Sequence, residues 1–326
     1  MADINFKELL AEITKCENTV IVGHSHPDGD CVGSAAALSI LMKALGKKAY
    51  VIFPEPSPRR LEFLLDGIEV LYELPENLDD YSVICVDVAS PVQMASLREA
   101  IENRVDIRID HHALDTPYAK HEFVDSNAAA AGEIITLLYD YAKSTGCISG
   151  ILTEALTPLF GAISSDTGCF KYANASARTH LCAAYLIEAG VNSAEINRLL
   201  FDSKEPSQLK AEGIAASRLE TFADGKISGI AIELSDYENG LNIKDFETSI
   251  DIARSLAGVK CAVSVKASPT PCVFRASLRS NDDTDVSKIA AIFGGGGHIR
   301  AAGCSVEASC AKEALGKLIA ELEKVL

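Results

Sequence analysis

The sequence predicts an α/β fold, with a doubly wound, mainly parallel sheet in the N-terminal part and a smaller α+β domain after it. Short β-branched runs alternate with helical patterns over the first half, as in parallel strands joined by helical crossovers. Helical patterns then follow one another up to residue 189, and strand-like runs return from residue 227. A length of 326 residues suits two domains with a core in each.

The first half supplies the strands of the parallel sheet. Apolar, β-branched runs predict strands over residues 19–22, 49–53, 82–86 and 105–109. Apolar spacing predicts a helix over residues 32–45, which Gly46 ends. Ligands of a doubly wound sheet bind at the carboxyl ends of its strands, so the polar segments that follow these strands are the expected place of a functional site.

The second half predicts a change of architecture. Helical patterns cover residues 128–141, 153–163 and 177–189, and the polar segment near residue 201 indicates a boundary. We therefore assign residues 1–200 to the first domain, 201–212 to a linker and 213–326 to the second domain, with the active-site cleft between the two domains. In the second domain we expect a helix over 212–222, strands over 227–232, 260–266 and 273–278, and an amphipathic closing helix over 309–326.

The composition restricts the partners. The chain has 30 Lys and Arg against 46 Asp and Glu, a formal net charge of −16. Long nucleic acids and anionic membranes are polyanions and are not expected partners, whereas a small phosphorylated ligand or divalent cations can bind at a local site. No apolar run has the length of a membrane span and no export signal is evident, so we expect a cytoplasmic protein whose ten scattered cysteines are free thiols.

Polar side chains follow three of the predicted strands. The first segment reads His24-x-x-x-Asp28-x-Asp30, the second begins with Asp87, and the third is Asp110-His111-His112. Each segment alone has an ordinary explanation: an Asx-turn with Asp30 capping the next helix, a turn before a Ser-Pro pair, or a solvated loop. A further carboxylate, Asp166, stands where a helix C-cap turn closed by a glycine would serve equally well.

Taken together, these segments predict a metal site. Carboxyl ends of parallel strands meet at one edge of the sheet, so the first three segments should converge there. Carboxylate and imidazole donors suit Mn²⁺ and Mg²⁺. Six ligands are more than one cation needs and suit two ions that share a carboxylate, an arrangement used in phosphoryl chemistry. The candidate ligands are His24, Asp28, Asp30, Asp87, His111 and Asp166.

A glycine run marks the second domain. Four glycines, residues 294–297, precede His298, and successive N–H groups of such a run can cradle a phosphate. We expect a helix to begin near His298 and to add its positive end. Arg279 offers a planar fork that suits a terminal phosphate. The ordinary alternatives are a flexible loop and a surface salt bridge.

These motifs resemble the DHH phosphoesterase superfamily, named for the tripeptide at residues 110–112. The segments Ser277-Leu278-Arg279-Ser280 and 294–303, which include Ala301-Ala302-Gly303, resemble the DHH-associated C-terminal domain, so that the likeness covers nearly the whole chain. Within the superfamily, the chain is most similar to the NrnA-type group of nanoRNases (oligoribonucleases) and pAp phosphatases. Every residue of the superfamily motifs that we looked for is present in this sequence.

The resemblance implies a role for each residue. His24 and Asp28 would bind one metal ion, Asp30, His111 and Asp166 the other, and Asp87 would bridge them. His112 would contact the scissile phosphate, and Asp110 would orient the histidines. The nucleotide end of the substrate would be held by Arg279, Ser280, Gly295, Gly296, Gly297 and His298. Mn²⁺ is the favoured ion, with Mg²⁺ and Co²⁺ as alternatives, and a homodimer is compatible with the resemblance.

The expected activity is hydrolysis of short oligoribonucleotides such as pApA to mononucleotides, and of pAp (3′-phosphoadenosine 5′-phosphate) to AMP and phosphate. A hydroxide activated by the two metal ions would attack phosphorus. Three alternatives stay open: a phosphodiesterase of the cyclic dinucleotide c-di-AMP, a nucleotide sensor without turnover, and an inorganic pyrophosphatase. The glycine-rich C-terminal motif disfavours the pyrophosphatase, and the intact ligand set disfavours the sensor.

Overall fold

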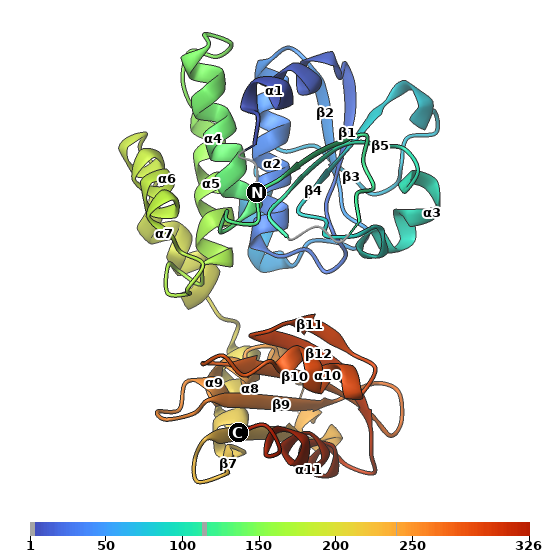
Figure 1. Ribbon diagram of the computed structural model, residues 1–326, viewed down its shortest axis with the longest axis vertical. Helices are drawn as coiled ribbons and strands as arrows, with labels where there is room; N and C mark the ends of the chain where they lie inside the picture. The colour runs from blue at the N-terminus through green and yellow to red at the C-terminus, as the bar shows by residue number, and fades with distance from the viewer. Residues whose placement is uncertain (1–3, 113–115, 239) are drawn as a thin grey trace. The chain divides into compact units, whose positions relative to one another are not determined.

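The computed structural model describes residues 4–112, 116–238 and 240–326. The chain divides into two compact units, Met1–Ser203 and Lys204–Leu326, each built around its own sheet (Figure 1). This confirms the predicted α/β fold with a second, smaller domain.

The first unit contains a six-stranded sheet in the order β3-β2-β1-β4-β5-β6, in which all neighbouring strands are parallel. The strand order turns back between β1 and β4, and such a switch point opens a crevice at the carboxyl ends of the two strands. The sequence did not predict the short strands β3 and β6. The strands are β1 (Asn18–Val22), β2 (Lys48–Ile52), β3 (Val70–Leu71), β4 (Ser82–Val86), β5 (Val105–Asp110) and β6 (His121–Val124).

Helices cover both faces of this sheet because both faces of its strands are apolar. On β1, Ile21 packs into the core formed with the long helices, whereas Val20 and Val22 pack into a second core with Met94 and Ile101. The long helices are α1 (Phe6–Lys15), α2 (Gly29–Ala44), α4 (Ala131–Ser144) and α5 (Thr153–Asp166), and the opposite face carries η3 (Pro91–Leu97) and α3 (Arg98–Ile101). After them come α6 (Ala177–Glu188), α7 (Ser193–Asn197) and the short η4 (Arg198–Asp202).

The second unit contains a mixed sheet in the order β11-β12-β10-β9-β8-β7, in which only the β8–β9 pair is parallel. Helices α10 and α11 share one core with this sheet, and α8 and α9 share another. The strands are β7 (Glu220–Phe222), β8 (Ile227–Ile232), β9 (Cys261–Ala267), β10 (Val273–Ser280), β11 (Gly296–His298) and β12 (Ala301–Glu307). The helices are α8 (Pro206–Ser217), α9 (Ser249–Arg254), α10 (Val286–Ile292) and α11 (Ala311–Leu322).

The structure corrects two helices expected from the sequence. The helix expected over 212–222 is α8, which begins at Pro206 inside the expected linker, and its last expected residues form β7. Proline is favourable at the first position of a helix, and the side chain of Gln208 accepts the N–H of Glu205 there (2.9 Å). No helix begins near His298, because residues 296–298 pair with β12 as a hairpin strand.

All ten cysteines are unpaired thiols, and half of them are buried. They pack as small apolar side chains, as Cys31 and Cys85 do in the cores of the first unit. Within the three described stretches of chain, no helix has both the length and the apolar character that crossing a bilayer requires.

The close packing of α2 against α5 can be tested by a substitution at Gly33. A Cβ at Gly33 would lie 2.3 Å from the carbonyl oxygen of Pro158 and 3.1 Å from the Cβ of Ala162. We expect Gly33→Ala to lower the free energy of unfolding by about 1–3 kcal/mol, because the two helices must separate to admit the methyl group. Urea denaturation followed by circular dichroism measures this change.

Gly213→Ala is the matched control. Gly213 also lies in a helix, α8, but beyond its chain neighbours and the backbone of this helix no described atom lies within 4 Å of the position its Cβ would take. The control should be stabilising by about 0.5–1 kcal/mol, since alanine restricts the unfolded chain more than glycine does. A Gly33→Ala protein as stable as the wild type would contradict the close packing.

Candidate metal centre

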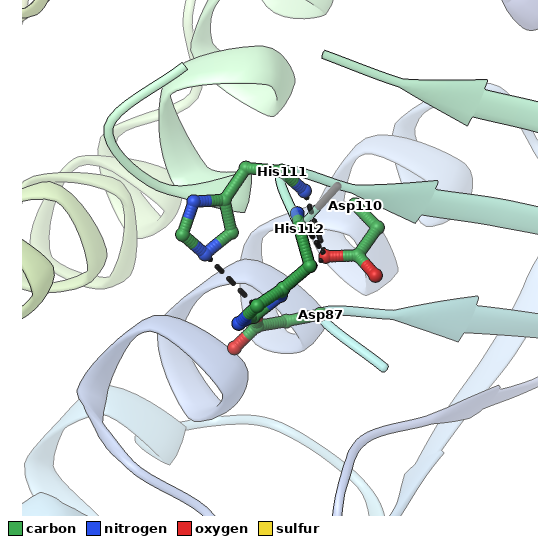
Figure 2. Close-up of side chains that lie close together, drawn as sticks. All are labelled: Asp87, Asp110, His111 and His112. Carbon is green, nitrogen blue, oxygen red and sulfur yellow. Dashed lines mark hydrogen bonds and ion pairs between the residues drawn. The ribbon is translucent and has the colours of Figure 1, made fainter. Parts of the chain in front are cut away.

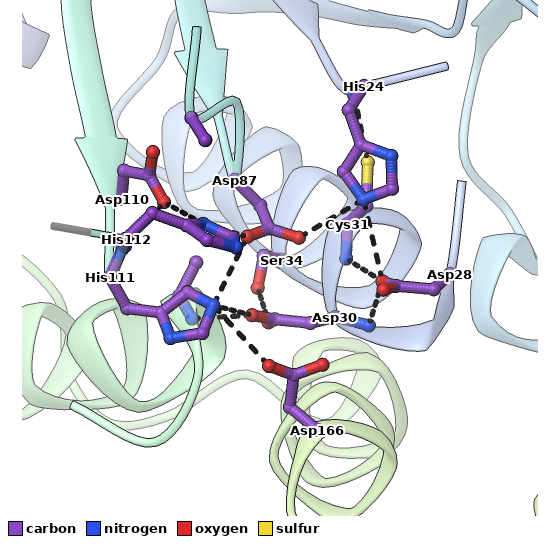
Figure 3. A network of polar contacts seen from close by, with 12 residues as sticks. His24, Asp28, Asp30, Cys31, Ser34, Asp87, Asp110, His111, His112 and Asp166 are labelled. Carbon is purple, nitrogen blue, oxygen red and sulfur yellow. Dashed lines mark hydrogen bonds and ion pairs between the residues drawn. The ribbon is translucent and has the colours of Figure 1, made fainter. Parts of the chain in front are cut away.

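The fold brings the predicted acidic and histidine segments together at the carboxyl edge of the first sheet. His24 follows β1, Asp87 follows β4, and Asp110 ends β5. The fourth segment arrives differently, because α5 continues through Asp166 and presents this side chain from its last turn. Figure 3 shows the candidate ligand Asp166 facing the strand ends together with Asp30 of α2.

Asp87 lies at the centre of the group. Its Oδ2 lies 3.4 Å from Nε2 of His24, and its Oδ1 lies 3.4 Å from Nε2 of His111. The residue has a φ of 58°, a left-handed conformation that is rare outside glycine and costs backbone energy. Its Oδ1 is buried and accepts no hydrogen bond from the described residues. A buried carboxylate oxygen left in this way is costly unless a cation satisfies it.

The first side-chain cluster lies on the Oδ2 side of Asp87. Nε2 of His24 is 3.7 Å from Oδ1 of Asp28, and Nδ1 of His24 contacts the carbonyl oxygen of Ser25 at 2.7 Å. This second contact directs Nε2 toward the carboxylates. Asp28 caps α2 by accepting the N–H groups of Asp30 and Cys31, so the capping residue is Asp28 and not Asp30.

The second cluster lies on the Oδ1 side. Nε2 of His111 is 3.4 Å from Oδ2 of Asp166 and 3.7 Å from Oδ2 of Asp30. The carboxylate of Asp30 is fully buried and accepts the N–H groups of Ala131 (2.6 Å) and Gly132 (2.9 Å) at the start of α4. The positive end of α4 therefore supports the charge of Asp30 and fixes its orientation.

Asp110 and His112 form a neighbouring pair. Oδ1 of Asp110 accepts the backbone N–H groups of His111 (2.7 Å) and His112 (3.0 Å), and it lies 2.8 Å from Nδ1 of His112 (Figure 2). An ionised carboxylate only accepts hydrogen bonds, so Nδ1 of His112 carries a proton in this contact. The same Nδ1 is 3.5 Å from Oδ1 of Asp87.

Burial and charge perturb the pKa values of these groups in opposite directions. Burial and the charge of Asp87 raise the pKa of Asp30 to about 7, and burial with the charge of Asp30 raises the pKa of Asp166 well above its usual range. Burial opposes ionisation of Asp87, but its contacts with His111 and His24 hold the pKa of Asp87 below its usual range. The site thus holds more carboxylates than its own histidines can neutralise, which favours bound cations.

The donor set fits two divalent cations. Ligand atoms of Asp30, His111 and Asp166 lie within 4.8 Å of one another, as do those of His24, Cys31 and Asp87. A third set, around His112, shares Asp87 and His111 with them. Hard oxygen donors with imidazole nitrogen suit Mn²⁺ or Mg²⁺. The buried Oδ1 of Asp87 is the atom that most requires a cation.

The substrate-binding residues expected in the second unit lie around the β10–β12 pair. Arg279 lies on β10, and its Nη1 donates to the carbonyl oxygen of Leu278 (3.0 Å). Ser280 is buried, and its hydroxyl donates to Asp282 within a turn (3.0 Å to the carbonyl oxygen), so the hydroxyl has a structural role. The backbone of His298 lies in β11, and its side chain lies outside the described part of the structure.

Two glycines of the run are required by packing. A Cβ at Gly295 would lie 2.2 Å from the carbonyl oxygen of Gly303, and one at Gly297, where φ is 140°, would lie 2.5 Å from that of Ala301. No described atom lies within 4 Å of the equivalent position at Gly296. The close approach of β11 to β12 therefore explains Gly295 and Gly297, and Gly296 remains open to a ligand.

The sequence analysis missed two residues that contact the site. The Sγ of Cys31 accepts the backbone N–H of His24 (3.2 Å), and burial raises the pKa of Cys31 to about 12, so the thiol is neutral. Arg108 is buried on β5 and contacts Asp110. Cys31 stands next to Asp30 in the first motif, and Arg108 stands in the predicted strand that leads to Asp110, so each had a signal in the sequence.

Comparison with known proteins agrees with this geometry. Residues 18–163 match the N-terminal domain of the DHH family, and residues 211–326 match the DHHA1 domain. The chain is similar over 98% of its length to a solved exopolyphosphatase-related protein from Bacteroides fragilis, of which it covers 95%, with a TM-score of 0.88. The sequence identity is 22%, so this likeness shows the fold alone.

Two curated relatives carry named activities. The chain is 30% identical over 304 residues to the bifunctional oligoribonuclease and PAP phosphatase NrnA of Thermus thermophilus, and the match covers 92% of this chain and 88% of that protein. It is 25% identical over 324 residues to the cyclic-di-AMP phosphodiesterase GdpP of Bacillus subtilis. That second match covers 94% of this chain but 47% of the relative, so the chain spans about half of GdpP.

The raised pKa of Asp30 predicts a pH-dependent response to metal. A carboxyl whose pKa rises from its ordinary value of 3.8 to about 7 on folding stabilises the metal-free protein at low pH, and this contribution is lost as the pH rises through about 7. Metal binding requires the ionised form and offsets the loss. Mn²⁺ should therefore raise the melting temperature more at about pH 8 than at about pH 5.5.

Two variants complete this test by thermal melting with and without Mn²⁺. Asp166→Asn removes a candidate ligand of the second cluster and should reduce the Mn²⁺-induced shift at both pH values. Asp285→Asn changes a carboxylate that caps α10 in the second unit and should leave the shift unchanged. An equal shift at the two pH values for the wild type would show that the carboxylates of the site do not bind the ion.

Proposed function

The chain belongs to the DHH family, and we propose that it is a metal-dependent phosphoesterase that hydrolyses short oligoribonucleotides such as pApA, and pAp, to mononucleotides. One observation carries the proposal: the buried Asp87 lies between His24 and His111 and turns one oxygen toward each. A shared carboxylate is what two ions acting on one phosphate require. The similarity to the Thermus thermophilus relative supports the substrate class.

We assign the ligands by the two clusters. His24 and Asp28 would hold one ion, and Asp30, His111 and Asp166 would hold the other, with Asp87 shared by the two clusters. Two bound ions would supply an activated water and neutralise charge that develops on the phosphoryl group. The chain's own contribution is rigidity, because the start of α4 holds Asp30 and the contact with Ser25 orients His24. Mn²⁺ is the ion we favour, with Mg²⁺ and Co²⁺ as alternatives.

His112 acts on the substrate rather than on the ions, and Asp110 orients it. Asp110 holds Nδ1 of His112, so Nε2 is the ring nitrogen that can contact an oxygen of the scissile phosphate. Such a contact orients the phosphoryl group and stabilises charge on the leaving oxygen. In the reaction, water adds across the phosphorus–oxygen bond, which gives two AMP molecules from pApA, or AMP and phosphate from pAp.

The second unit supplies the substrate clamp in this proposal. The guanidinium of Arg279 would bind the terminal phosphate of the nucleotide, and the open Gly296 would let the backbone approach it. The buried hydroxyl of Ser280 supports the turn rather than the ligand. A clamp on one nucleotide end needs no long basic groove, which agrees with a net charge of −16.

A cyclic-dinucleotide phosphodiesterase is the second candidate function. The similarity to GdpP, which extends over 94% of this chain, favours it. Both activities use the same metal centre, so they differ only in whether the substrate has a free end. The substrates therefore have to be compared directly.

We expect purified protein with Mn²⁺ to cleave pApA and pAp and to leave pyrophosphate intact. Chromatography resolves the products from five parallel reactions, with pApA, a five-nucleotide RNA, pAp, c-di-AMP and pyrophosphate. Release of pApA from c-di-AMP at a comparable rate would establish the second candidate function. Hydrolysis of pyrophosphate alone would contradict the nucleotide clamp, and inactivity on all five would indicate a sensor.

A second prediction separates the clamp from the metal centre. Arg279→Ala should raise the KM for pApA by about 10–100-fold, because hydrogen bonds to charged groups contribute about 1.5–3 kcal/mol. Mn²⁺ binding, measured by titration calorimetry, should not change. Arg218→Ala, which breaks a surface ion pair with Asp236 in the same unit, is the control and should alter neither quantity. Equal losses of substrate and metal binding in Arg279→Ala would refute the division of roles.

A further inference from the structure

A buried arginine contacts residues that adjoin the candidate metal centre. Arg108 belongs to strand β5, which lies between β4 and β6, and its side chain is 0% exposed. Burying a cation is costly unless it is fully paired, and an aliphatic side chain would suit this strand better. The contacts of Arg108 therefore indicate the role of this residue.

The guanidinium contacts two segments that carry functional residues. Nε and Nη2 of Arg108 both donate to Oδ2 of Asp110, at 3.0 Å for Nε. Nη2 also donates to the carbonyl oxygen of Ala89, two residues after Asp87 (3.1 Å). One planar group thus binds the carboxylate that orients His112 and the turn that carries Asp87.

A second residue completes the same contact. The hydroxyl of Tyr118 donates to the carbonyl oxygen of Val88 (2.6 Å), and its ring lies 4.9 Å from the guanidinium carbon of Arg108. Glu122 accepts the N–H of Tyr118 (2.7 Å) and lies 3.5 Å from Nη1 of Arg108. The two consecutive carbonyl groups after Asp87 therefore each accept a hydrogen bond from a side chain, that of Val88 from Tyr118 and that of Ala89 from Arg108.

We propose that Arg108 is a positioning residue that fixes Asp87 and His112 relative to each other, through Ala89 on one side and Asp110 on the other. This inference rests on the proposed phosphoesterase function, in which Asp87 is a metal ligand and His112 contacts the phosphate.

The backbone conformation of Asp87 explains why such a contact is needed. A residue with a φ of 58° persists only where its surroundings hold it, and the carbonyl groups of Val88 and Ala89 are the atoms that are held. Asp110 accepts on both oxygens, from Arg108 on Oδ2 and from the two histidines on Oδ1, so its plane cannot rotate. Only the fork of an arginine reaches both partners, since lysine offers a point charge.

The test compares four variants of the full-length protein. Arg108→Met removes the charge and keeps the length, Arg108→Lys keeps the charge and removes the fork, and Tyr118→Phe removes only the hydroxyl. The matched control is Arg104→Met, because Arg104 also pairs with a backbone carbonyl and a carboxylate near β5 but away from the site (Leu78 at 2.9 Å and Asp79 at 2.8 Å). The readouts are kcat and KM on pApA, Mn²⁺ affinity by calorimetry, and the Nδ1–H signal of His112 by nitrogen-edited NMR.

We expect kcat to fall by about 10–100-fold in both Arg108 variants, with KM changed by less than about threefold and Mn²⁺ affinity lowered by about tenfold. The Nδ1–H signal of His112 should be lost to exchange, because the ring is no longer held in one orientation. Tyr118→Phe should show a smaller loss of kcat, and Arg104→Met should match the wild type.

Several outcomes would overturn the inference. It is wrong if Arg108→Lys restores wild-type kcat, because charge alone would then suffice, or if Arg104→Met loses as much as Arg108→Met. If Arg108→Met does not fold, Arg108→Lys and Tyr118→Phe decide by the same readouts. If the wild type cleaves no substrate, the proposed function fails, and the NMR signal with Mn²⁺ affinity still decides whether Arg108 positions the two residues.

Discussion

The rest of the first unit depends on one buried carboxylate. Asp87 stands at the point where the strand order of the sheet turns back, between β1 and β4, and its Oδ1 accepts no hydrogen bond from the described residues. Its backbone is held in a left-handed conformation. An arrangement that costs energy in three ways, by burial, strain and an unsatisfied oxygen, persists where binding a cation compensates for it. The candidate ligands lie on both sides of Asp87, in two groups whose ligand atoms are close enough to hold such a cation.

Small residues let two further candidate ligands lie close to Asp87. Asp30 and Asp166 come from two helices, α2 and α5, which approach closely because Gly33 faces the backbone of Pro158. Helix α4 joins them through Gly132, whose Cβ would meet Ala162, and its N-terminal N–H groups then bind Asp30. The distances between the carboxylates therefore depend on how closely the three helices pack. A larger side chain at these contacts would move the carboxylates apart.

The sequence predicts which side chains come together at the site better than it predicts the contacts that hold them there. Parallel strands place residues that follow them at one edge, so His24, Asp87 and His111 could be assigned to one site from their positions after strands. The hairpin that replaces the expected helix at His298 could not be predicted, because glycine runs carry no periodic pattern. The start of α8 at Pro206 was missed for a related reason: its capping by Gln208 depends on geometry that a polar segment does not reveal.

Arg108 shows the limit of pattern analysis most clearly. In a strand that reads Val-Asp-Ile-Arg-Ile-Asp, the alternation assigns the arginine to a polar, solvated face, yet this residue is fully buried in a strand that has a neighbour on each side. This difference is informative, because a cation is kept in the buried part of a sheet only if it binds several acceptors at once. Its acceptors are Asp110 and the turn after Asp87, two places that a periodic pattern treats as unrelated. A charge that is fully buried within a parallel strand is therefore a reason to look for a functional group at the end of that strand.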